Sequence, residues 1–154
     1  MTSNQRPLAL QMCPFSPMLD KGVQALFDVV RWDTLAADAQ AAFLRGRGAQ
    51  VRAMATGGHI GCPPPLMAAL PALGIIAING VGVDKVDLAE AARRGIGVTN
   101  TPDVLTADVA DLAIGLVIDL LRGIARGDLH VREGHWPSGD RPLAHRVSGR
   151  KFGI

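Results

Sequence analysis

Short apolar runs that end in glycine-containing turns alternate with amphipathic segments along most of this 154-residue chain. The apolar runs cover residues 8–12, 51–55, 75–78 and 96–99. Continuous apolar runs of this length are typical of parallel strands, because helices cover both faces of a parallel sheet. The alternation of strand and helix therefore predicts an α/β fold with a parallel sheet and helices on both faces.

Helix signals stand between the first three runs. Ser16 followed by Pro17 supplies an N-cap and a favoured first helical residue, and apolar residues at helical spacing predict one helix over residues 17–31. A second helix is expected over residues 37–45, and a short one should begin at residues 63–65.

Two further helices are expected after the third run. Asp87 and Glu90 resemble a capping box, and Gly95 suits the left-handed residue that ends a helix. Thr106 can cap a long helix that is apolar on most of its circumference. Such a helix is usually buried on several sides, which suits an element between two domains or two subunits.

Charge and composition exclude several classes of protein. The chain is 48% hydrophobic and carries 16 basic against 14 acidic side chains without a basic stripe, so we expect a globular domain that does not bind nucleic acid. The first ten residues lack a signal-peptide pattern, and the apolar segment 112–121 is too short for a membrane span and contains Asp119. We therefore expect a cytoplasmic protein without a membrane partner, in which Cys13 and Cys62 are reduced, buried thiols.

Glycines gather where two predicted strands end. Gly57 and Gly58 follow one strand, and Gly80 and Gly82 follow the next. Ligands of open α/β sheets bind at the carboxyl ends of the strands, and successive N–H groups in glycine turns can form a nest for a small carboxylate. The alternative is that these glycines only make tight turns.

Several segments together resemble the NAD(P)-dependent D-2-hydroxyacid dehydrogenases, and within them the glyoxylate/hydroxypyruvate reductases. They are residues 80–88 (GVGVDKVDL), 94–102 (RGIGVTNTP) and 104–113 (VLTADVADLA), with 55–58 upstream and 134–137 downstream. In that family a flavodoxin-like substrate domain, built from both chain ends, flanks a Rossmann cofactor domain. The resemblance implies a substrate-binding domain over residues 1–103, an inter-domain helix and dimerisation arm over 104–150, and the first cofactor-domain strand beginning at 151–154.

The resemblance also implies roles for individual residues. The N–H groups of Val81 and Gly82 would grip the substrate carboxylate, beside a wall formed by Gly57 and Gly58. Thr106 would touch the dinucleotide, NAD or NADP, although a simple N-cap explains it too. Trp136 would reach the partner subunit's active site in a homodimer, or serve only as a packing anchor.

No catalytic residue is assigned. The family's catalytic histidine, carboxylate and arginine lie beyond the dinucleotide fingerprint, and no G-x-G-x-x-G occurs in this sequence. His59 and Cys62 could be taken as a metal pair, but two ligands do not make a zinc site, so no metal is expected.

The sequence therefore predicts the N-terminal part of an oxidoreductase that reduces a small 2-oxoacid, inactive as the isolated chain. The alternative is a non-enzymatic module that binds a small carboxylate or forms dimers.

Overall fold

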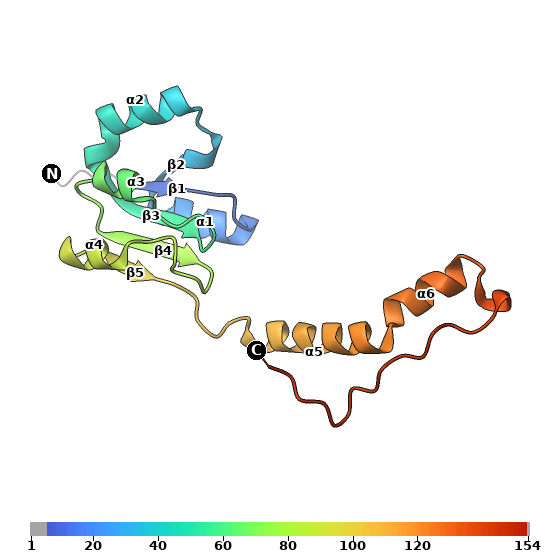
Figure 1. The fold of residues 1–154 in the computed structure, drawn as a ribbon. Coiled ribbons are helices and arrows are strands. Elements are labelled where there is room, and N and C mark those ends of the chain that lie inside the picture. The colour runs from blue at the N-terminus through green and yellow to red at the C-terminus, as the bar shows by residue number, and fades with distance from the viewer. Residues whose placement is uncertain (1–5, 154) are drawn as a thin grey trace. The chain divides into compact units, whose positions relative to one another are not determined.

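A computed structural model describes residues 6–153 of the chain (Figure 1). The chain divides into two compact units, with the boundary between Pro102 and Asp103. Each unit is built from its own contacts and is described by itself.

The first unit is a five-stranded parallel sheet. Its strands are β1 (Leu8–Gln11), β2 (Asp28–Arg31), β3 (Val51–Gly57), β4 (Ile75–Asn79) and β5 (Gly97–Thr99). They lie in the order β2-β1-β3-β4-β5, and every pair is parallel. This is the flavodoxin-like order, so the predicted α/β fold is confirmed.

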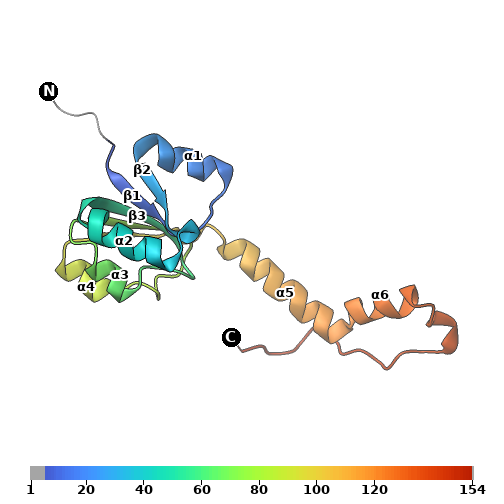
Figure 2. The ribbon, with the colours of Figure 1, turned by 90° about the horizontal axis from the view of Figure 1, so that it is seen from above.

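Helices lie on both faces of the sheet (Figure 2). They are α1 (Pro17–Leu26), α2 (Ala37–Arg47), α3 (Pro64–Ala68) and α4 (Leu88–Arg93), with short 3₁₀ turns η1 (Trp32–Thr34) and η2 (Gly48–Gln50). The hydrophobic core contains residues from α3 and α4, and α2 packs against it with Phe43 and Leu44. Leu19 and Val23 of α1 instead lie with Ala55 and Ala77 around a groove on the other face. Side chains alternate between the faces of a strand, so one set of strand residues meets α1 and the other meets the core.

One predicted helix was too long. The segment 17–31 was expected to be a single helix, but α1 ends at Leu26 and residues 28–31 form β2 beside β1. Val29 and Val30 are β-branched, and their backbone groups pair with β1. The tertiary pairing overrides the apolar spacing that placed Val30 on a helix face.

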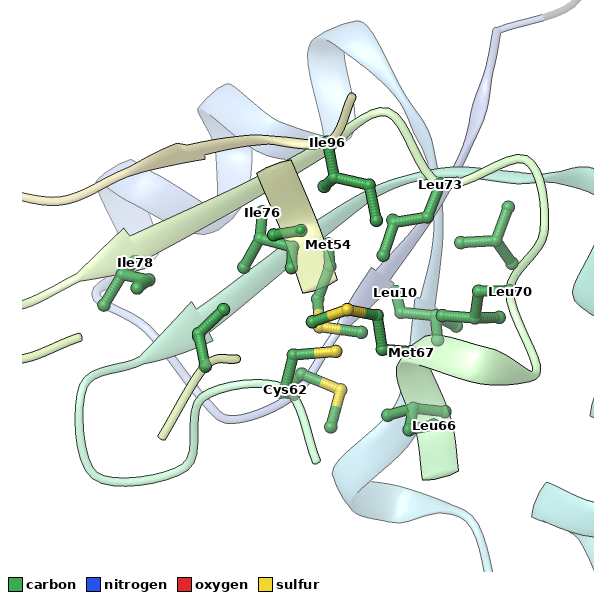
Figure 3. Packing of buried hydrophobic residues seen from close by; sticks show 14 of the residues in the cluster. Leu10, Met54, Cys62, Leu66, Met67, Leu70, Leu73, Ile76, Ile78 and Ile96 are labelled. Carbon is green, nitrogen blue, oxygen red and sulfur yellow. The ribbon is translucent and has the colours of Figure 1, made fainter. Parts of the chain in front are cut away.

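The core lies between the sheet and the helices α2, α3 and α4. Leu10, Met54 and Ile76 come from neighbouring strands and meet Met67 and Leu70, all with at most 1% of their surface exposed (Figure 3). Cys62 lies fully buried in the same cluster, and Cys13 is buried too, each with a free thiol as expected. Because three neighbouring strands, β1, β3 and β4, contribute to this cluster, its packing fixes the positions of the strand ends that follow it.

Three predicted helix caps of the first unit are confirmed, although α1 ends before residue 31 and α2 extends past residue 45 to Arg47. Ser16 Oγ accepts from the N–H of Leu19 at 3.4 Å, and Asp87 Oδ1 accepts from the N–H of Glu90 at 2.9 Å. Gly95 has the left-handed φ of 68° that was expected after α4. Local capping chemistry is therefore readable from the sequence.

The second unit consists of α5 (Thr106–Arg122), α6 (Ile124–Arg132) and the 3₁₀ turn η3 (Trp136–Ser138). Gly123 joins the two helices in the left-handed conformation, and Asp119 Oδ1 accepts from the N–H of Ala125 at 2.7 Å. Thr106 was predicted to cap α5, but Leu105 occupies the cap position without a side-chain hydrogen bond and Thr106 is the first helical residue.

The apolar side chains of α5 are exposed within this chain. Leu112, Leu116 and Leu120 keep 59–75% of their surface exposed, and the helix has no buried residue. Residues 151–153 form no helix or strand, while residues 1–5 and Ile154 lie outside the described part. The expected lack of a signal peptide in the first ten residues and the expected strand beginning at 151–154 fall partly on residues outside the described part. Across residues 6–153, no helix combines the length and apolarity that a membrane crossing requires.

The core thiol generates a prediction about pH. Burial raises the pKa of Cys62 to about 11, so between about pH 9 and 11 the unfolded chain loses a proton that the folded chain keeps. Stability should therefore fall through this window as pH rises. Urea unfolding at pH 8 and pH 10.5 is expected to show a larger loss for the native chain than for Cys62→Ala, whose lower overall stability changes less with pH. Equal losses would contradict this account.

Candidate functional site

The glycine turns predicted to bind a ligand lie at one edge of the sheet. Gly57 is the last residue of β3, and its register partner is Asn79, the last residue of β4. Gly58 directly follows β3, and Gly80 directly follows β4. Parallel pairing thus places the two turns side by side at the carboxyl ends of the strands, where ligands bind in open α/β sheets.

The two turns approach each other so closely that a Cβ atom on either glycine would crowd the facing backbone. A Cβ atom on Gly58 would lie 3.1 Å from the carbonyl oxygen of Gly82, and one on Gly80 would lie 3.3 Å from the nitrogen of Gly58. Gly80 also has a φ of 154°. These glycines therefore do more than turn the chain, because they let two backbone segments meet without side chains between them.

The N–H groups of Val81 and Gly82 are available to a ligand. Both residues are exposed, and no hydrogen bond from either N–H is found within residues 6–153. Exposed, successive N–H groups are suited to binding an anion. The structure thus brings the turn with Gly57 and Gly58 close to the turn with Val81 and Gly82.

Asn100 holds this turn from the neighbouring strand and was missed as a functional residue. Its side-chain Nδ2 donates to the carbonyl oxygen of Val81 at 2.8 Å, and the N–H of Thr101 donates to the carbonyl oxygen of Gly80 at 2.9 Å. The sequence placed Asn100 in a turn after a strand. The sequence did contain a signal for this role. Asn100 directly follows β5, the strand next to β4, so it lies at the same edge of the sheet as the Val81 turn.

The other turn is fixed by buried contacts. Thr56 is fully buried, and its Oγ1 donates to the carbonyl oxygen of Gly61 at 2.8 Å. Gly61 has a φ of 63°, and its Cβ position is filled by the backbone of Lys85. Cys62 then forms a parallel bridge with Val86. The segment after Gly58 is therefore anchored to the segment after Gly82.

The charged groups near the end of β1 neutralise each other. Arg31 donates to both carboxylate oxygens of Asp33, at 3.0 and 2.8 Å, and this pairing holds the pKa of Asp33 below its usual range. Burial raises the pKa of Cys13, whose sulfur accepts a hydrogen bond from the backbone of Gly57. Cys13 is therefore a neutral neighbour of the glycine turn and not an activated nucleophile.

The other two candidate residues belong to the second unit. Thr106 is exposed at the first turn of α5, and Trp136 lies in η3 with 72% of its surface exposed. Trp136 lines a hollow with His130 and Arg141 of the same unit. Within residues 6–153, His59 and Cys62 belong to no cluster of three or more metal-binding side chains.

Comparison with known proteins gives a consistent result. Residues 15–148 match the family described as D-isomer specific 2-hydroxyacid dehydrogenase, catalytic domain. The chain is 43% identical over 145 residues to hydroxyphenylpyruvate reductase of Plectranthus scutellarioides, which covers 94% of this chain and 46% of that protein. The chain spans about half the length of the curated relatives it matches.

Solved structures share the fold. The 2-hydroxyacid dehydrogenase of Ketogulonicigenium vulgare Y25 is 43% identical with a TM-score of 0.84, covering 95% of this chain and 46% of that one. The NADPH-dependent glyoxylate/hydroxypyruvate reductase of Sinorhizobium meliloti, solved with NADP and malonate, is 38% identical with a TM-score of 0.76. That match covers 95% of this chain and 44% of that one.

The Asn100 contact predicts how the Val81 turn behaves in solution. Asn100→Ala removes the donor to the Val81 carbonyl, so the ¹⁵N order parameters of Val81 and Gly82 should fall from about 0.85 toward about 0.6. Asn79→Ala is the matched control, since Asn79 lies at the end of β4 and no side-chain hydrogen bond of it is found within residues 6–153. Unchanged order parameters in Asn100→Ala, or an equal drop in the control, would refute this role.

Proposed function

The chain belongs to the D-isomer specific 2-hydroxyacid dehydrogenase family, and we propose that it forms the substrate-binding part of an oxidoreductase. The proposed reaction is the reduction of a small 2-oxoacid, of the glyoxylate or hydroxypyruvate type, to the D-2-hydroxyacid with NADH or NADPH. The observation that carries this proposal is the contact between the turns after β3 and β4, which leaves two backbone donors exposed at the carboxyl edge.

The proposed role of the glycine turns is to bind the substrate carboxylate. The N–H groups of Val81 and Gly82 donate to its oxygens, and Gly57 and Gly58 form the adjacent wall. Backbone donors held in place lose little entropy when the ligand binds, because the Asn100 and Thr101 hydrogen bonds already position the turn. The ligand needs no basic side chain for this contact.

The turns of the first unit do not fit the pyrophosphate of a dinucleotide. A pyrophosphate site needs a glycine turn that opens directly into a helix, whereas residues 80–87 separate β4 from α4, which has six residues. We therefore propose Thr106 alone as a cofactor contact within this chain. We assign no catalytic residue here and propose that catalysis uses residues this chain does not contain.

The free thiols support a reducing compartment. Cys13 and Cys62 are both buried and unpaired with each other, as expected for a protein of the cytoplasm. We therefore propose that the protein is located in the cytoplasm.

Binding and turnover can be tested separately on this chain. Titration with glyoxylate is expected to shift the NMR signals of the Val81 and Gly82 amides, while NADPH mixed with the chain and glyoxylate should keep its nicotinamide absorbance. Gly58→Ala pushes a Cβ atom toward the Gly82 carbonyl and should weaken binding about tenfold, which is about 1.4 kcal/mol. Gly22→Ala is the control, since a Cβ atom there meets nothing within 4 Å.

The outcomes distinguish the proposal from its alternatives. Absence of saturable shifts at Val81 and Gly82 would overturn the carboxylate role of this turn. Oxidation of NADPH by the isolated chain would overturn the proposal that catalysis needs further residues. If the chain binds glyoxylate but the complete protein shows no reductase activity, the result would favour the non-enzymatic carboxylate-binding module.

We also propose that the chain forms a homodimer through its second unit. The exposed apolar side chains of α5 and the exposed Trp136 are the kind of apolar surface that a second subunit often covers. Light scattering is expected to give twice the chain mass of 16.2 kDa. Leu116→Glu and Leu120→Glu should shift the mass toward the monomer because they place charge in the contact. A monomeric native chain would contradict the proposal.

A further inference from the structure

A hollow lies at the amino ends of the strands, at the opposite end of the sheet from the glycine turns. Its lining is chemically different from those turns. Its volume is about 210 Å³, and its lining consists of Arg6, Pro7, Leu8, Asp28, Arg47, Gln50 and Arg52. The residues come from the start of β1, the start of β2, the end of α2 and the start of β3. Folding therefore collects three arginines from separate parts of the chain around one space.

A bulge in the sheet places one of these arginines. Leu8 pairs with Val51, but Ala9 pairs with Ala53, so Arg52 is an extra residue in β3 opposite β1. Bulges bend a strand and redirect a side chain, and they occur often beside binding sites. Arg52 is exposed, and its guanidinium donates no hydrogen bond found within residues 6–153.

The other two guanidinium groups are held by contacts with the protein. Arg6 Nη1 donates to the carbonyl oxygen of Gln24, near the C-terminal end of α1, at 2.7 Å. Arg47 Nη2 lies 3.2 Å from Asp28 Oδ2, and its guanidinium stands 5.8 Å from the centre of the Phe43 ring. Two of the three cations are thus positioned before any ligand arrives, which lowers the entropy cost of binding.

The charge of the hollow is unbalanced. Three arginines and a single carboxylate, that of Asp28, line the hollow, and only Arg47 pairs with Asp28, so two positive charges remain without a carboxylate among the lining residues. Guanidinium forks match the oxygens of phosphate groups and bind them with paired hydrogen bonds. The hollow is smaller than the roughly 300–1,000 Å³ typical of drug-sized ligands, so it suits one phosphate group better than a nucleotide.

We propose that this hollow binds the dianionic phosphate group of a small phosphate monoester. The site is separate from the glycine turns, because it lies at the amino ends of the strands and shares no residue with them. It stands independently of the proposed reductase function, since it rests on the three arginines and the bulge alone.

Arginine side-chain NMR tests this proposal on the chain as it exists. The native chain is titrated with inorganic phosphate and with glycerol phosphate at pH 8, against sodium chloride at matched ionic strength. The Nε–Hε signals of Arg6, Arg47 and Arg52 are expected to shift and saturate with both phosphates but not with chloride. Tighter binding of glycerol phosphate identifies a monoester as the ligand, while tighter binding of inorganic phosphate overturns that identification.

Two variants separate the site from general surface charge. Arg52→Gln should weaken phosphate binding at least fivefold without moving the melting temperature, since Arg52 is exposed. Arg45→Gln removes the same charge from α2 outside the hollow and should leave binding unchanged. Arg6→Gln gives a second test if Arg52→Gln alters the fold of the bulge. Shifts that follow ionic strength alone, or an equal effect of Arg45→Gln, would overturn the proposal.

Discussion

The direct backbone contact between the turns after β3 and β4 is the constraint on which the candidate substrate site depends. It exists because Gly58 and Gly80 carry no side chain and because parallel strands end at the same edge. Buried contacts fix one turn through Thr56 and Gly61, and Asn100 fixes the other. The groups that we propose to bind the carboxylate at this edge are therefore backbone N–H groups, and the side chains around them position the backbone.

The core and the edge sites share one structural cause. Leu10, Met54 and Ile76 lock three neighbouring strands together, which sets the positions of both strand ends at once. The carboxyl ends present the glycine turns, and the amino ends present arginines. A single sheet thus displays neutral donors for a carboxylate at one edge and cationic donors for a phosphate at the other, which keeps the two proposed ligands chemically distinct.

The apolar surface of α5 has a different meaning from that of the core. The sequence shows a helix that is apolar on most sides, and the structure shows that this chain alone leaves it exposed. Helices with a wide apolar face are usually stabilised by packing of that face against another element. The chain spans about half the length of the curated relatives it matches, and Thr106 and Trp136, for which we propose contacts with the cofactor and a second subunit, both belong to the same unit as α5.

Much of the fold was predictable because its signals are local. The apolar runs, the caps at Ser16 and Asp87 and the left-handed Gly95 follow from nearby residues alone. For the glycine turns, glycine spacing alone left open whether they only turn the chain, and the roles of Gly57, Gly58, Val81 and Gly82 came from the family resemblance. Only the tertiary structure decided that residues 28–31 form β2, that Asn100 supports Val81, and that Arg6, Arg47 and Arg52 meet. These features depend on pairing and packing between segments far apart in the chain, which local spacing does not encode.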